Sequence, residues 1–329
     1  MISRESSLLE ILSPFRPYLD APKITEIAVN KQGELWFEAE GVWGVEYLPC
    51  ITTRHLHALG VAAATYSGQL WNSSRPILSA NLPDGIRLQM LMPPALEEGG
   101  YAFVMRKPMR TVLSLDALAT SGLFDSVMPC GETRKAVDSA LKNYLAVQDY
   151  ASFLREAVRA RKNIVVSGPT GSGKTTLMKA LVQEIPLDER IITIEDTREL
   201  FMPHKNVVHL LYAKSAASAV LTPKDLLESC LRMKPSRILL AELRGDETFY
   251  YIRNAVSGHP GSITSCHAGS VHLAYKQLAL MIMDSKAGSG LSFELISQLL
   301  ALSIDIVVQM QAERGRRYIS EINLSADRG

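Results

Sequence analysis

The sequence predicts an α/β fold with two parts: a C-terminal half built on a largely parallel sheet, preceded by a smaller α+β unit. Short β-branched runs alternate with helical segments from residue 163 onward, which is typical of βαβ units. Residues 24–106 instead show the apolar and polar alternation of antiparallel strands. The chain has 329 residues, longer than an average single domain, so two domains are expected.

The first 106 residues are interpreted as the N-terminal α+β domain. Apolar side chains alternate with polar ones over 35–40 and again over 86–92, which predicts half-buried strands. Between them, residues 52–65 have helical spacing and begin at a threonine that can cap the first turn. The sequence Leu-Pro-Asp-Gly over 82–85 predicts a hairpin turn.

A linker is predicted over 107–132, because the sequence there loses its periodicity and Pro129 and Gly131 break regular structure. Amphipathic stretches near 133–148 and 150–161 predict helices. The C-terminal domain is therefore expected over 133–329. Its predicted strands include 164–166, 191–194, 207–211, 238–240 and 304–308.

A glycine-rich segment lies between the strand 164–166 and a helical run over 175–183. It matches GxxxxGK[ST], in which glycines let backbone N–H groups converge on phosphate oxygens at a helix N-terminus. An ordinary glycine-rich turn is the alternative, but the strand before it and the helix after it favour a phosphate-binding loop. The predicted nucleotide-binding residues are Gly168, Pro169, Thr170, Gly171, Ser172, Gly173, Lys174, Thr175 and Thr176.

Two residues of this loop have specific expected roles. Lys174 should reach the β- and γ-phosphates of a nucleotide, and the Thr175 hydroxyl should bind Mg²⁺. ATP and Mg²⁺ are the cofactors that such a loop predicts.

Acidic residues end two of the predicted parallel strands. Glu195 and Asp196 follow 191–194, and Glu242 follows 238–240 after one intervening alanine. The carboxyl ends of parallel strands share one sheet edge, where ligands bind, so these acids are expected to face the phosphates. Glu242 is the preferred candidate for polarising water, and Glu195 is a second catalytic candidate. Glu195 and Asp196 are also candidate metal ligands with Thr175, while capping of the following helices is the alternative role.

Two histidines bracket a short β-type run, His259 before it and His267 after it. This spacing can put His267 at a strand end near the γ-phosphate. A zinc site formed by His259, Cys266 and His267 is an alternative, but the spacing fits no common structural zinc site. From the residues alone, ordinary loop histidines are the simpler interpretation.

Arginines supply candidate charge partners for the phosphates. Arg106 ends the first domain and Arg87 lies on a nearby predicted strand. Either side chain could reach across to the phosphates and stabilise their charge in the transition state. Most isolated arginines are solvated surface residues, which is the alternative. Three further arginines crowd the strand 238–240 and could pair with its acids or with nucleotide: Arg232, Arg237 and Arg244.

Composition and charge limit the functional classes. A hydrophobic content of 47% is ordinary for a globular protein, and a net charge of +1 offers no global attraction for nucleic acid or an anionic membrane. No stretch of about 18 uncharged apolar residues predicts a transmembrane helix, and the N-terminus lacks the apolar core of a signal peptide. Four scattered cysteines suit reduced thiols in a cytoplasm better than a disulfide framework.

The motifs occur in an order that resembles the traffic ATPases of bacterial type II and type IV secretion. The likeness is greatest to the hexameric ATPases of VirB-type type IV systems, and residues 27–30, 82–87 and 105–108 extend it into the first half. The segments that resemble the Walker A, Asp, Walker B and His boxes are 168–176, 190–197, 229–238 with 241–245, and 258–268.

This resemblance implies a RecA-like ATPase domain joined by the linker to the N-terminal domain, in a homohexameric ring. It implies that nucleotide binds between the two domains, with Arg106 contacting phosphates and His267, supported by His259, sensing the γ-phosphate. Relatives usually have glycine where Ala241 stands, so the added methyl group bears on catalytic efficiency.

The resemblance also implies where and with what the protein works. ATP hydrolysis would drive assembly or substrate translocation of a type IV secretion system through nucleotide-driven domain motions. The protein would be cytoplasmic, acting with other secretion components at the cytoplasmic face of the inner membrane and touching that membrane only peripherally.

Two other functions share part of the motif set. A ring helicase or nucleic-acid motor has the same core, but the near-zero net charge and 7% aromatic content give it little support, so no specific nucleic-acid binding is expected. A nucleotide-gated scaffold without hydrolysis is the second alternative. The intact Lys174, Thr175 and Glu242 argue against it.

Overall fold

The computed structural model describes residues 4–108, 112–128, 132–212 and 221–325. The two breakers of the predicted linker, Pro129 and Gly131, and one of the four cysteines, Cys130, lie outside the described residues. The first half contains, in order, α1 (Arg4–Ile11), η1 (Ser13–Phe15), α2 (Arg16–Asp20), β1 (Ile24–Val29), β2 (Glu34–Ala39), β3 (Val42–Tyr47), α3 (Thr53–Ser67), β4 (Ile77–Asn81), η2 (Pro83–Gly85), β5 (Arg87–Leu91) and β6 (Ala102–Arg106).

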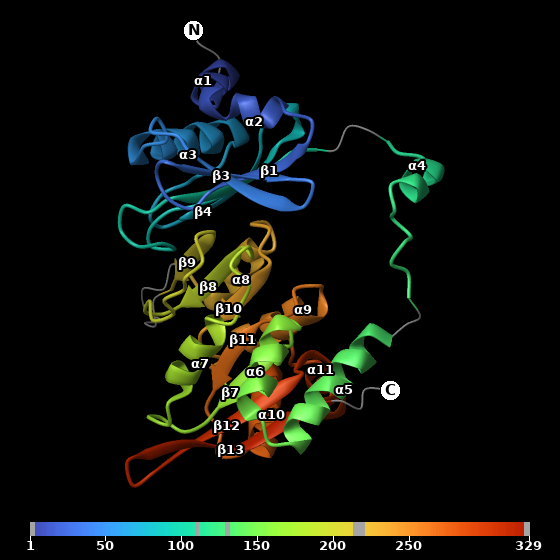
Figure 1. The fold of residues 1–329 in the computed structure, drawn as a ribbon. Helices are drawn as coiled ribbons and strands as arrows, with labels where there is room; N and C mark the ends of the chain where they lie inside the picture. Colours follow the sequence, from blue (N-terminus) through green and yellow to red (C-terminus); the bar gives the residue numbers. More distant parts are fainter. Residues whose placement is uncertain (1–3, 109–111, 129–131, 213–220, 326–329) are drawn as a thin grey trace.

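The second half is an alternation of helices and strands (Figure 1). It contains α4 (Leu115–Thr120), α5 (Glu132–Ala146), α6 (Tyr150–Arg159), β7 (Ile164–Ser167), α7 (Lys174–Val182), β8 (Ile191–Glu195), β9 (Val207–Leu211), α8 (Pro223–Cys230), β10 (Arg237–Leu240), α9 (Glu247–Val256), β11 (Ile263–Cys266), α10 (Val271–Asp284), α11 (Phe293–Ser303), β12 (Ile306–Glu313) and β13 (Arg316–Leu324).

The N-terminal part is a six-stranded antiparallel sheet in the order β3-β2-β1-β6-β5-β4. Helices α1, α2 and α3 pack on one face of it (Figure 1). Helix α3 begins where the sequence predicts, because the Thr52 hydroxyl accepts a hydrogen bond from the His55 N–H at 3.1 Å. The predicted strands at β2 and β5 and the turn over 82–85 are confirmed.

One expectation about these strands was wrong. The alternation over 86–92 predicted a strand with a solvent-facing side, yet Gln89 on β5 is only 2% exposed. The second face of the sheet is not open to water, because Leu91 and Val104 belong to an apolar core shared with the C-terminal half. A sequence pattern reports polarity and cannot show that another domain covers the polar face.

The C-terminal part is built on parallel strands in two hydrogen-bonded sets, β10-β8-β9 and β11-β7-β12-β13. Strands β10 and β11 adjoin, since the Ser265 hydroxyl donates to the Ala241 carbonyl at 2.8 Å and the Leu243 N–H donates to the Ser265 carbonyl at 2.8 Å. The predicted strands of this half are confirmed. The antiparallel strand β13, which extends the sheet beyond β12, was not predicted.

Helices cover both faces of this parallel sheet, which makes a three-layer sandwich. Residues from α5, α6 and α7 form one core with β7 and β12, as Phe153 and Met178 illustrate. Residues from α8, α9, α10 and α11 form the other, as Leu226 and Ile296 illustrate. The carboxyl ends of β7, β8, β10 and β11 therefore meet at one edge of the sheet.

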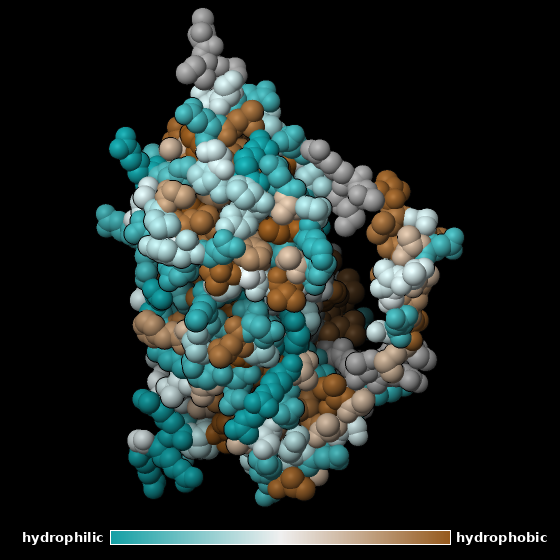
Figure 2. Space-filling model, turned by 45° about the horizontal axis from the view of Figure 1, so that its top comes forward, coloured by the Kyte–Doolittle hydropathy of each residue, from teal (hydrophilic) through white to brown (hydrophobic). Residues whose placement is uncertain are grey.

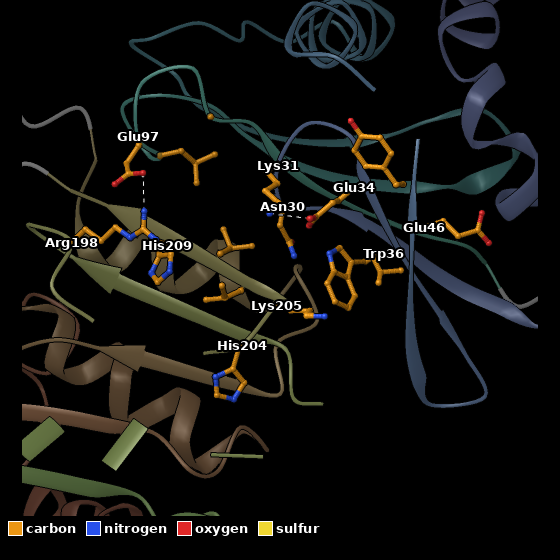
Figure 3. A pocket seen from close by; sticks show the side chains of 16 residues that line it. Asn30, Lys31, Glu34, Trp36, Glu46, Glu97, Arg198, His204, Lys205 and His209 are labelled. Carbon is orange, nitrogen blue, oxygen red and sulfur yellow. Dashed lines mark hydrogen bonds and ion pairs between the residues drawn. The ribbon is translucent and has the colours of Figure 1, made fainter. Parts of the chain in front are cut away.

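The N-terminal sheet packs against the β9 side of the parallel sheet, as Figure 3 shows around Asn30, Trp36 and His204. Arg190 is fully buried at this contact and donates to the Asn30 side chain at 2.8 Å and to the Met233 carbonyl at 3.0 Å. Its guanidinium also lies 5.3 Å from the ring centre of Trp43. A cavity of about 800 Å³ remains between the two domains beside these residues.

The segment that joins the domains stands away from both of them (Figure 2). It carries the short helix α4, and apolar side chains along it face solvent: Val112, Leu113, Leu115, Leu123, Phe124, Val127 and Met128. An exposed apolar segment of this kind marks an interaction surface. Within the described ranges, no helix is long and apolar enough to cross a membrane.

Candidate nucleotide-binding site

The glycine-rich loop connects β7 to α7, which confirms its predicted strand, loop and helix context. Gly171 and Gly173 have φ angles of 79° and 96°, in the left-handed region that other residues rarely adopt. A Cβ at Gly168 would lie 2.6 Å from the Met310 carbonyl oxygen. The glycines are therefore required by backbone conformation and by the close approach of β12.

Lys174 lies inside this loop. Its ammonium donates to the Gly168 carbonyl at 2.8 Å and to the Pro169 carbonyl at 3.1 Å. Burial lowers the pKa of Lys174, with the nearby Glu242 carboxylate opposing the shift. Thr175 and Thr176 are exposed in the first turn of α7, where free N–H groups and the helix dipole attract anions.

Glu242 follows β10 at the same sheet edge. Its Oε1 lies 2.6 Å from Nε2 of His267, and its Oε2 accepts a hydrogen bond from Arg244. Burial alone would raise the pKa of Glu242, but Arg244, His267 and Lys174 outweigh it and hold the pKa below its ordinary value. The carboxylate is therefore ionised at neutral pH and sits next to the loop.

His267 connects Glu242 to the loop. It follows β11, and its Nδ1 lies 3.3 Å from the Lys174 ammonium. Lys174 at the start of α7, His267 after β11 and Glu242 after β10 thus form a continuous polar chain. The sequence interpretation of His267 as an ordinary loop histidine does not account for this position.

The structure separates the two neighbouring acids that follow β8. Glu195 is fully buried, and its Oε2 accepts from the N–H groups of Glu199 and Leu200, both at 2.8 Å. Oε1 accepts from the Thr193 hydroxyl at 2.8 Å. Burial alone would raise the pKa of Glu195, but a hydrogen bond to His209, followed by these bonds, outweighs it and lowers the pKa.

Both oxygens of the Glu195 carboxylate thus have protein partners, and its catalytic and metal-binding roles stay predictions. Asp196 is the acid that faces the site. Its Oδ2 lies 3.7 Å from Arg244, which also contacts Glu242. The predicted pairing of Arg244 with the acids of this edge is confirmed. Arg237 instead pairs with Glu189 at 2.7 Å, away from the loop.

Arg106 lies apart from the loop in this chain. Its Nε is 3.7 Å from Glu26, which also pairs with Lys234, beside a polar cavity of about 740 Å³ that His259 borders. Lys234 and His259 precede β10 and β11, so this cavity is at the opposite sheet edge from the loop. Nucleotide between the two domains, which the resemblance implies, and the phosphate contact of Arg106 therefore stay predictions.

The zinc alternative has no support in the geometry. His259 precedes β11 and His267 follows it, so the two histidines stand at opposite ends of a strand. Cys266 is fully buried, and burial raises the pKa of its thiol to about 11. Among the described residues, no three histidine, cysteine or acidic side chains are grouped so that they could hold a metal ion.

One residue beside the loop was missed by the sequence reasoning. Arg317, on β13, donates from Nε to the Gly171 carbonyl at 3.1 Å. The sequence offers one signal here, the segment Arg-Gly-Arg-Arg over 314–317 after the last predicted strand. The segment predicts no contact with the loop, because the loop is 146 residues away in sequence.

Together, the glycine-rich loop, the buried lysine and the acid at the end of a neighbouring parallel strand define the class of protein: a RecA-like nucleotide-binding domain carrying a second, α+β domain. The model of the family "Type II/IV secretion system protein" matches residues 133–317. A crystal structure of the VirB11 ATPase from the Brucella suis type IV secretion system, in complex with sulphate, superposes with a TM-score of 0.93 at 46% identity. The match covers 98% of this chain and 95% of that one.

Two curated relatives agree with that match. The type IV secretion system protein VirB11 of Brucella abortus biovar 1 (strain 9-941) is 48% identical over 98% of this chain and 91% of its own length. The PtlH homolog of Bordetella bronchiseptica is 41% identical over 95% of this chain and 93% of its own. The chain belongs to the type II/IV secretion system protein family, and within it to the VirB11-type ATPases.

Proposed function

We propose that this protein hydrolyses ATP with Mg²⁺ and thereby powers a type IV secretion system. The observation that carries the proposal is the chain of contacts from Lys174 through His267 to Glu242, which joins the phosphate-binding loop to an ionised carboxylate. A carboxylate held beside a phosphate loop can orient and polarise the attacking water. Family membership and the VirB11 relatives support the same function.

Each residue of the chain of contacts has a separate task in this proposal. Lys174 neutralises the β- and γ-phosphates, for which it would exchange its bonds to the loop carbonyls. Glu242 positions water opposite the bond that breaks. His267 contacts both Lys174 and Glu242 and senses whether the terminal phosphate is present. Loss of that phosphate would change the contact between His267 and Glu242.

The residues at this edge fit a magnesium ion. The exposed Thr175 hydroxyl and the Asp196 carboxylate are oxygen ligands of the kind that Mg²⁺ prefers, and the bound phosphates would complete the set. Mg²⁺ would supply charge neutralisation between the β- and γ-phosphates. Of the two candidate acids, Asp196 is the proposed metal ligand, since the Glu195 carboxylate accepts hydrogen bonds from the protein backbone.

Assembly into a homohexamer is part of the proposal. The exposed apolar linker segment over 112–128, together with exposed Leu273, Leu280 and Phe293 on α10 and α11, supports contacts between copies. The Arg106 side chain is 69% exposed and cannot reach the loop of its own chain. In the ring it would contact the phosphates bound at the loop of a neighbouring copy. Other secretion components would hold the ring at the cytoplasmic face of the inner membrane.

Phosphate release by the purified chain tests the proposed activity and separates it from the scaffold alternative. We expect release with Mg-ATP to stop when EDTA removes the metal and to be lost in Lys174→Ala. Glu98→Ala, an exposed change on a loop of the N-terminal domain, serves as the control and should keep full activity. Nucleotide binding without any phosphate release by the wild-type chain would favour the scaffold and contradict the ATPase.

A further inference from the structure

The position of Arg317 beside the phosphate-binding loop has no role in the proposed hydrolysis. The hairpin formed by β12 and β13 borders the loop on the side away from Glu242, because the sheet order is β11-β7-β12-β13. Met310 approaches Gly168 from β12, and the Arg317 stem approaches Gly173 from β13, where a Cβ would lie 3.1 Å from Cδ. The loop thus has His267 and Glu242 on one side and this hairpin on the other.

This arrangement sets the direction of a bound nucleotide. The loop wraps the β-phosphate, and the terminal phosphate must face Glu242 and His267 on the β10 and β11 side. The three phosphates form an unbranched chain with the nucleoside attached at its other end. With the terminal phosphate on the Glu242 side, the nucleoside leaves the loop on the opposite side. That side is the one bordered by β12 and β13.

Arg317 is held in place there with a free planar face. Its Nε is used by the bond to the Gly171 carbonyl, which leaves the two terminal nitrogens of the guanidinium without a bond to another described residue. No carboxylate of the described part of the chain pairs with it, whereas Arg314 at the hairpin tip lies 4.0 Å from Glu313. A guanidinium fixed at one edge and open on its face is suited to stacking on an aromatic ring.

We propose that Arg317 stacks on the nucleobase of the bound nucleotide and so forms the wall of a base subsite between the β12–β13 hairpin and the loop. This inference rests on the proposed nucleotide function and names a contact to the base, which the phosphate-binding motif does not supply. The phosphates already have the loop N–H groups and Lys174 as partners. Arg317 therefore adds affinity for the nucleoside portion of the ligand.

The test compares a ligand with a base to one without. Binding of Mg-ADP and of Mg-pyrophosphate to the full-length chain is measured by calorimetry for the wild type, Arg317→Ala, Arg317→Lys and the control Arg314→Ala. We expect Arg317→Ala to weaken ADP binding about tenfold and to leave pyrophosphate binding unchanged. Arg317→Lys keeps the charge and loses the planar face, so it should recover only part of the ADP affinity. Arg314→Ala should bind both ligands like the wild type.

Three outcomes overturn the inference in different ways. Equal loss of ADP and pyrophosphate affinity in Arg317→Ala would mean that the residue holds the loop or the phosphates. Unchanged ADP affinity would mean that it contacts no part of the nucleotide. If the wild-type chain bound neither ligand, the proposed nucleotide function would fail as well, and that result is distinguishable from the other two.

Discussion

At the scale of single residues, Glu195 and Asp196 show how neighbouring acids take different tasks. Successive side chains of a strand point to opposite sides, so only one of the two can face the loop. Glu195 faces inward and binds the backbone of residues 199 and 200, while Asp196 faces Arg244 and the loop. The sequence places both acids at the correct edge, but the choice between them depends on which side of the strand end the loop occupies.

Glu195→Gln tests the structural role of this carboxylate. Its pKa is lowered in the folded protein, so its contribution to stability is complete above the ordinary value of 4.5 and is lost as pH falls through the folded-state pKa. We expect the variant to lose about 1 to 2 kcal/mol of unfolding free energy at pH 7 and to approach the wild type at lower pH. Urea unfolding at several pH values measures this.

The rate of phosphate release is the control measurement for Glu195→Gln. Because both oxygens of the Glu195 carboxylate have protein partners, folded Glu195→Gln should still release phosphate at close to the wild-type rate. A rate as low as that of Lys174→Ala, in protein shown to be folded by circular dichroism, would restore Glu195 as a catalytic residue.

At the scale of elements, most helices and strands could be predicted from the sequence, because the signals for them are local. The Thr52 cap, the βαβ alternation and the glycine-rich loop each depend on a few adjacent residues. Strand β13 and the position of Arg317 were not predictable in the same way. Both depend on a hairpin that returns to a loop 146 residues earlier in the chain.

The start of α3 gives a test of one such local signal. Thr52→Ala removes the acceptor of the His55 N–H, which then lies in a helix end without a side-chain partner. We expect the free energy of unfolding to fall by about 1 kcal/mol, measured by urea unfolding. Ser73→Ala, at an exposed loop position, is the control and should leave it unchanged. An effect equal to that of the control would show that the cap contributes nothing.

At the scale of the whole molecule, the arrangement of the two domains is what the sequence could not supply. The resemblance implies nucleotide between the two domains but does not say how they pack. In this chain the N-terminal sheet packs on the β9 side, and Arg106 lies beside Glu26 at the far edge. The contacts that fix this arrangement join residues far apart in sequence, such as Asn30 and Arg190, so no local pattern predicts them. Arg190 instead emerges as the buried link between the domains.

Removing that link should loosen the domain contact. Arg190→Met keeps a long side chain and loses the hydrogen bonds to the Asn30 side chain and the Met233 carbonyl. We expect a loss of about 2 to 3 kcal/mol in unfolding free energy, because the buried Met233 carbonyl loses this partner and the Asn30 side chain loses one of its bonds. Arg75→Met, at an exposed position, is the control. Equal urea unfolding curves for both variants would show that Arg190 does not hold the domains together.

The central claim is that Glu242 activates water at a site whose phosphates are held by the loop. Glu242→Gln removes the charge and keeps the shape, so it should bind Mg-ATP as the wild type does while phosphate release falls by about a hundredfold or more. Measuring both quantities on the same preparation tests the claim most directly. Tight ATP binding with phosphate release near the wild-type rate would contradict it.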